Sequence, residues 1–130
     1  MKVRVADIIN GVAVIQSWGR FTSTPVFGFT MARVIRAAEP ILASYDEQRV
    51  KLLKQYGKPP ASPGGDYTFE TIEKREECGR AIAEVAAEEV DLPGVEPLSA
   101  KLLEAETTRT IGFMPTMGEL IAVAWLFTTD

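Results

Sequence analysis

The chain has 130 residues, 46% of them apolar and 25% charged, a composition that predicts one globular domain over residues 1–130 and excludes a disordered polypeptide. Its single cysteine excludes an intrachain disulfide, and its net charge of −4, with no concentrated basic face, argues against nucleic-acid binding. No basic leader precedes a long apolar run, and no apolar stretch nears the roughly 18–20 residues that cross a bilayer, so we expect neither a signal peptide nor a membrane contact.

The charge is unevenly distributed along the chain. Residues 1–37 hold five basic side chains and one acidic one, a net of +4, whereas residues 38–130 hold nine bases and 17 acids, a net of −8. Two opposed parts of this kind could attract each other within the fold or between neighbouring copies. The plainer interpretation is a chance clustering of charges on solvated faces.

The first predicted helix covers residues 3–18. Apolar side chains recur there at three- and four-residue steps and so share one face: Val5, Ile8, Ile9, Val12 and Ile15. We expect Gly19 to end this helix in a left-handed conformation.

A second, long helix is predicted from Pro25 to Tyr56, with Ser23 or Thr24 as its N-cap. Pro40 lies inside it, and the apolar stripe keeps its phase across this proline, which favours a kinked helix over two abutting helices. Gly57 should end the helix. Residues 57–66 are rich in proline and glycine and predict a flexible loop.

The C-terminal half predicts shorter elements. A third helix is expected over residues 71–88, with Cys78 on its buried stripe, followed by an extended segment at 90–92 and a short helix or irregular segment at 97–106. Residues 107–113 alternate weakly and are consistent with a strand.

The last helix is predicted to begin at Thr116, because Thr116 and Glu119 have the spacing of a capping box. Its face from Leu120 to Phe127 is so apolar that we expect it to be buried in the domain or against another copy. The predicted fold class is therefore mainly α with a minor β element: a small helical domain with a long Pro-kinked central helix and a short two- or three-stranded sheet.

Residues that carry catalytic chemistry are scarce. The chain has no histidine, which removes the commonest general base, the usual nucleophile pairs and the commonest nitrogen ligand of metals. The carboxylate pairs Glu73–Glu77 and Glu84–Glu88 could hold a divalent cation or act as an acid–base pair, but charges on a helix usually form its solvated face. We expect no catalytic residue, no metal site and no cofactor, so an enzyme with a carboxylate-bound metal is the least favoured function.

Three groups of residues are candidates for a surface that binds a protein partner. The first is an aromatic cluster beside a basic residue, for which packing between the first two helices is the alternative: Trp18, Arg20, Phe21, Phe27 and Phe29. The second is the acidic face of the third helix, with Glu73, Glu76 and Glu77. The third is the apolar C-terminal segment, with Leu120, Trp125 and Phe127.

The order of these elements is similar to that of a family of small proteins encoded in tailed-phage and prophage genomes. The likeness rests on an amphipathic N-terminal helix, a second helix ending in the stretch from Arg36 to Gly57, a Gly-rich loop, a Glu-rich helix, the extended residues 90–92 and a short apolar C-terminal helix. The resemblance implies a phage or prophage origin, with no activity or catalytic residues to carry over.

Two functions follow as hypotheses from the resemblance and the candidate surfaces. The first is a non-enzymatic virion component or assembly factor that acts through contacts with itself or with other phage proteins. The second is a small acidic inhibitor that presents the glutamates of the third helix to a basic groove of a host enzyme. Either protein would be made in the host cytoplasm, and the first could remain in the virion.

Overall fold

The computed structural model describes residues 1–21 and 23–128, and it is mainly α with a minor β component, as the sequence predicts. The helices are α1 (Val5–Trp18), α2 (Pro25–Tyr56), α3 (Ile72–Ala87), α4 (Ala100–Arg109) and α5 (Met117–Ala122). The strands are β1 (Lys2–Arg4), β2 (Glu89–Asp91), β3 (Leu98–Ser99) and β4 (Phe127–Thr128).

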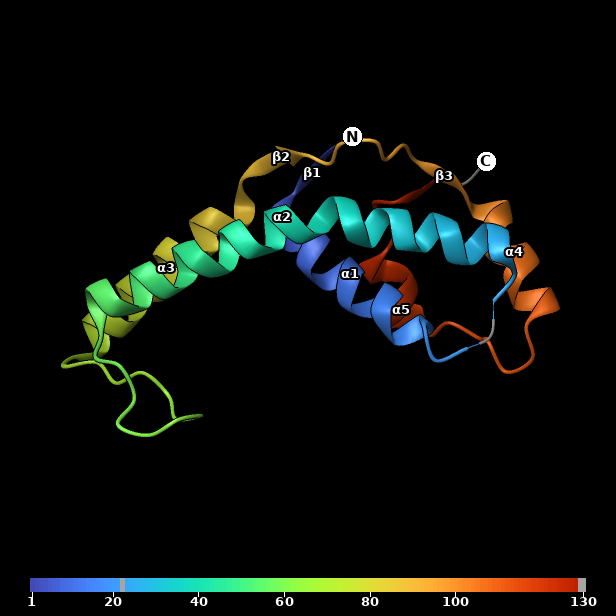
Figure 1. Cartoon of the computed structure of the whole chain (residues 1–130). Coiled ribbons are helices and arrows are strands. Elements are labelled where there is room, and N and C mark those ends of the chain that lie inside the picture. Colours follow the sequence, from blue (N-terminus) through green and yellow to red (C-terminus); the bar gives the residue numbers. More distant parts are fainter. Residues whose placement is uncertain (22, 129–130) are drawn as a thin grey trace.

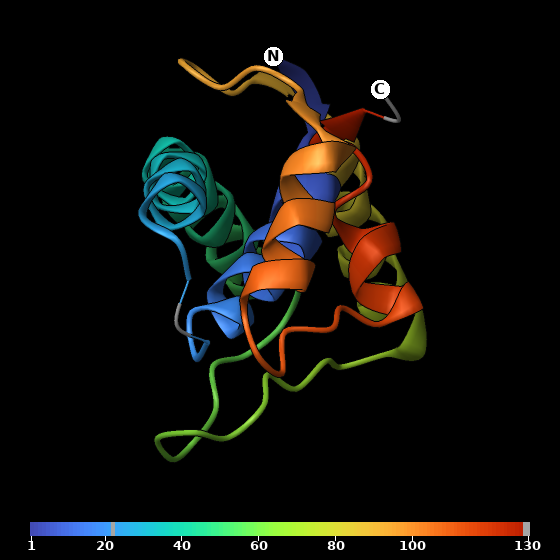
Figure 2. The same ribbon diagram turned by 90° about the vertical axis from the view of Figure 1, so that its right-hand side faces the viewer.

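The long helix α2 organises the molecule (Figure 1). Its first half lies over α1, α4 and α5, which together form a body, and its second half runs beside α3 to form an arm. Figure 2, which looks onto the body from the α4 end, shows α2 and α5 on opposite sides of α1 and α4. The loop between α2 and α3 extends from the far end of the arm.

Helix α2 confirms the prediction for the central element. It begins with Pro25 at its first turn, continues through Pro40 without a break, and ends at Tyr56. Its axis changes direction near the middle in Figure 1, as expected where a proline ring displaces the carbonyl one turn earlier. Gly57 follows in an extended conformation, and Lys58 forms an isolated antiparallel bridge with Thr68 that closes the base of the loop.

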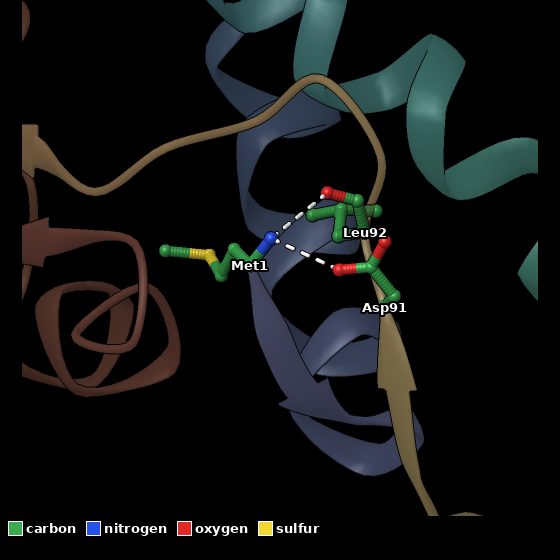
Figure 3. Close-up of polar contacts among 3 residues, drawn as sticks. All are labelled: Met1, Asp91 and Leu92. Carbon is green, nitrogen blue, oxygen red and sulfur yellow. Dashed lines mark hydrogen bonds and ion pairs between the residues drawn. The ribbon is translucent and has the colours of Figure 1, made fainter.

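Two small sheets replace the single predicted one. β1 pairs antiparallel with β2, so that Val3 lies opposite Val90, and β3 pairs parallel with β4. The first helix therefore begins at Val5, two residues later than predicted, because Val3 is buried in this strand pair. The Met1 amino group extends the pairing: it donates to the Asp91 carboxylate at 3.1 Å and to the Leu92 carbonyl at 3.3 Å (Figure 3).

Two local predictions are wrong. Gly19 has a right-handed conformation (φ −61°, ψ −14°), and its N–H donates to the Gln16 carbonyl in a tight final turn. The predicted strand at 107–113 is absent, because α4 extends through Arg109. A turn then follows in which Gly112 takes φ +81°, a conformation that glycine adopts without steric cost.

One core joins all the parts of the body. The largest fully buried side chains come from α1, α2 and the segments on either side of α4 and α5: Ile8, Val34, Leu92, Val123 and Leu126, together with Cys78 of α3. Each buried aliphatic side chain contributes about 1.5–3 kcal/mol by leaving water, so this cluster fixes the position of the short C-terminal elements.

Candidate interaction surface

The most unusual feature of the surface is an apolar stretch in residues 111–121. The exposed fractions are 99% for Ile111, 85% for Met114, 78% for Met117, 42% for Leu120 and 69% for Ile121. We call these five side chains the α5 patch. Two of them lie in the turn that leads into α5, and the other three share one face of α5 at three- and four-residue spacing.

The sequence prediction missed most of the α5 patch. It included Leu120, but it expected the apolar face from Leu120 to Phe127 to be buried in the domain or against another copy. Within the chain, Val123 and Leu126 of this face are fully buried, whereas Leu120 and Ile121 are exposed. The helix ends at Ala122 rather than running on, so Leu126 turns into the core while Ile121 stays outside. The available signal was a pair of methionines on either side of Pro115, Met114 and Met117, at a point where the chain turns.

Hydrogen bonds at the start of α5 hold the α5 patch in place. The Thr116 hydroxyl accepts from the Glu119 N–H at 3.1 Å, and the Glu119 carboxylate accepts from the Thr116 N–H at 2.9 Å, which confirms the predicted capping box. The second Glu119 oxygen accepts from the indole Nε1–H of Trp18 at 3.1 Å. The hydrogen bond from the Thr116 backbone is the main reason that the pKa of Glu119 lies below its ordinary value, although burial opposes it.

A buried carboxylate anchors the other end of the same segment. Glu106 on α4 is 3% exposed and accepts from the Thr24 N–H at 2.9 Å, the Thr24 hydroxyl at 2.7 Å and the Thr110 hydroxyl at 2.7 Å. Burial alone would raise the pKa of Glu106, but these hydrogen bonds and the nearby Arg109 outweigh it and hold the pKa below its ordinary value. Thr24 occupies the N-cap position of α2, but its side chain is used for this contact and not for capping the helix.

The aromatic cluster divides into a buried part and an exposed part. The Phe113 ring lies at the centre of the buried part. Its centroid is 5.3 Å from that of Trp18, which packs edge-on against it, 5.5 Å from that of Phe21 and 5.8 Å from that of Phe27. Trp18 and Phe27 are buried, so the interpretation of these two as partner-binding residues is wrong, and the alternative of helix packing holds. Arg20 lies over the Phe21 ring at 4.9 Å, at the surface.

Phe29 points away from that cluster and is 73% exposed on α2. It remains a candidate for contact with a partner.

Trp125 and Phe127 are packing residues for most of their surface. The Trp125 ring lies against Gly11 of α1, where a Cβ atom would come within 2.6 Å of its Nε1, and its N–H donates to the Ala122 carbonyl at 2.9 Å. Phe127 lies in β4 and packs on the core. Both side chains are partly buried, so neither belongs to the α5 patch.

The acidic face of α3 lies where the sequence predicts it. Glu73, Glu76 and Glu77 are all exposed, and Cys78 is buried with its thiol 3.7 Å from the Leu52 carbonyl. Burial raises the pKa of this thiol, which disfavours the reactive thiolate.

The sequence left open a metal site built from carboxylates. Over residues 1–21 and 23–128, no group of three or more Asp, Glu or Cys side chains is placed to hold a metal ion. A hollow of about 220 Å³ between α2, α3 and β2 is lined mainly by apolar side chains, with Glu88 as its one acidic member. No helix in this same part of the chain is both long enough and apolar enough to cross a membrane.

Comparisons of the chain with protein-family models, with curated proteins and with solved structures found no match.

Proposed function

We propose that this chain is a non-enzymatic protein of phage or prophage origin that acts through protein–protein contacts, as a virion component or an assembly factor. The observation that supports the proposal best is the α5 patch. Apolar patches on monomeric proteins rarely exceed a few hundred Å², and larger ones mark interaction sites. Four of the five side chains in the patch are at least two-thirds exposed, so most of their apolar surface faces solvent.

The way the patch is held also favours a docking surface. The turn and α5 are fixed to the body by Glu106 and Glu119, so a partner would meet side chains that are already positioned. Prepositioned surfaces lose less conformational entropy on binding. Methionine side chains suit such a surface, because they are unbranched and adapt to the shape of a partner.

The experiment is to look for the protein in purified particles and assembly intermediates of the phage that encodes it. A variant with Met114→Ser, Met117→Ser and Ile121→Ser should fold normally, because these side chains are exposed, and should be lost from the particles. A matched variant changes three exposed residues of α4 to serine: Lys101, Glu104 and Thr108. It should be retained. Equal retention of both variants would refute the role of the patch.

The second candidate function is inhibition of a host enzyme by the acidic face of α3. It is supported by Glu73, Glu76 and Glu77, which are exposed and make no ion pair within the described residues. Charge reversal at these three positions should then abolish capture of one identified host enzyme from a lysate that lacks phage proteins. Capture that is unaffected by charge reversal would rule out this function.

A further inference from the structure

The outer face of α2 in the body is basic and aromatic. Four residues recur there at three- and four-residue steps on the side opposite the buried Phe27 and Val34: Val26, Phe29, Arg33 and Arg36. Val26 and Phe29 are 67% and 73% exposed. Within the described residues, neither arginine has a carboxylate within ion-pair distance.

The outer face of α3 in the arm has the complementary character. It begins with Ile72, which is 76% exposed, and continues with four exposed glutamates: Glu73, Glu76, Glu77 and Glu84. Carboxylates one helical turn apart repel each other. One exposed arginine, Arg80, lies among these glutamates, but within the described residues it makes no ion pair with them. Glu70 pairs with Lys74 at 3.0 Å outside this face.

These two faces cannot meet within one molecule. The first half of α2 lies in the body, and α3 lies in the arm at the other end of the molecule (Figure 1). Among the described residues, the only ion pair that joins the basic residues 1–37 to the acidic remainder is that of the Met1 amino group with Asp91. The opposed charges of the two parts are therefore left largely unpaired by the fold.

We infer that copies of this chain associate head to tail, with the outer face of α2 in one copy packing on the outer face of α3 in the next. Charge complementarity carries the inference, since the α2 face presents two arginines and the α3 face presents four glutamates against the single Arg80. The inference deepens the proposed function, because it names a second copy of the chain as one of the protein partners.

The spacing of the residues defines one alignment of the two helices. If Phe29 packs beside Ile72 and the helices run parallel, Arg33 falls beside Glu76, because each lies four residues, about 6 Å, further along. The antiparallel alignment would place Arg33 beyond the start of α3. Because the two faces differ, the contact is heterologous, and repetition of it generates a ring or an open filament.

Sedimentation velocity of the purified full chain tests the inference. The wild type should show concentration-dependent association that weakens as salt is added, since exposed charges are screened. The variant Arg33→Glu/Arg36→Glu should associate at least about 100-fold more weakly, because like charges across an interface are strongly disfavoured. The variant Glu73→Lys/Glu76→Lys should lose association to a similar degree, and a mixture of the two variants should regain it to within about tenfold of the wild type.

A matched control lies on the same helix. Lys51→Glu/Lys54→Glu makes the same change of charge at the same three-residue spacing on the outer stripe of α2, but in the arm, and it should leave association unchanged. A monomeric wild type, association that survives the Arg33 and Arg36 reversals, or a mixture that stays monomeric would each overturn the inference. The particle experiment changes only the α5 patch, so a monomeric wild type would leave the proposed function standing.

Discussion

Replacing Glu106 with glutamine tests the carboxylate that joins α4 to the start of α2. The carboxylate is almost fully buried and accepts two hydrogen bonds from Thr24 and one from Thr110. Glutamine has nearly the same shape. Its amide oxygen can still accept from the Thr24 N–H and the Thr110 hydroxyl, while the Thr24 hydroxyl can turn to accept from the amide. The substitution therefore removes the charge and preserves the packing.

The size of the effect follows from the strength of hydrogen bonds to charged groups. Such bonds contribute about 1.5–3 kcal/mol each, against about 0.5–1.5 kcal/mol for neutral ones. Burying the neutral glutamine amide costs less free energy than burying the carboxylate, and this difference offsets part of the loss. We therefore expect the free energy of unfolding to fall by about 2 kcal/mol at pH 7. For a domain of this size that corresponds to a fall in Tm of about 6–10 °C.

The pH dependence gives the sharper test. The pKa of Glu106 is lowered in the folded chain from its ordinary value of 4.5, so the ionised carboxylate stabilises the fold above that value. This stabilisation is lost as the pH falls through the folded pKa. Urea unfolding of both proteins, followed by tryptophan fluorescence, should give a difference in the free energy of unfolding that is constant near neutrality and closes in acid. A difference that is absent, or that does not change with pH, would refute the reasoning.

Three further substitutions or reactions test other parts of the structure. Gly11→Ala should lower the free energy of unfolding by about 1–2 kcal/mol, although alanine favours a helix by about 1 kcal/mol, because its Cβ would overlap the Trp125 ring; a stabilised variant would contradict this packing. Glu119→Ala should lower the Tm in thermal unfolding, since the cap and the partner of the Trp18 indole are lost together, and an unchanged Tm would contradict the contact. Cys78 should react with a thiol reagent only as fast as the chain opens, since it is 1% exposed and its pKa is raised; an immediate reaction in the native state would show that it is accessible.

The elements that the sequence predicts well are those with local signals. Pro25 at a first turn and a stripe that keeps phase through Pro40 are both properties of neighbouring residues, and α2 follows them. The same holds for the capping box of Thr116 and Glu119. Apart from the local errors at Gly19 and residues 107–113, the errors concern contacts between distant residues. Val3 joins a strand because Val90 lies opposite it, and Phe127 leaves the helical pattern because it pairs with Leu98.

The candidate surface was predicted less well, because exposure depends on the whole fold. Nothing local distinguishes Trp18, which is enclosed by Phe113, from Phe29, which is not. The acidic face of α3 was recognised because its charges have a helical period, whereas Ile111 and Met114 lie in the segment before α5 and have no such period.

Cross-linking in cells tests whether the α5 patch is a contact surface for other proteins. A photoreactive phenylalanine analogue in place of Met117, on the patch, is compared with the same group in place of Lys101, which is exposed at the start of α4. In cells producing the phage proposed to encode the chain, we expect an adduct with an identified phage structural or assembly protein from position 117 and none from position 101. No adduct from position 117, or equal adducts from both positions, would contradict the account.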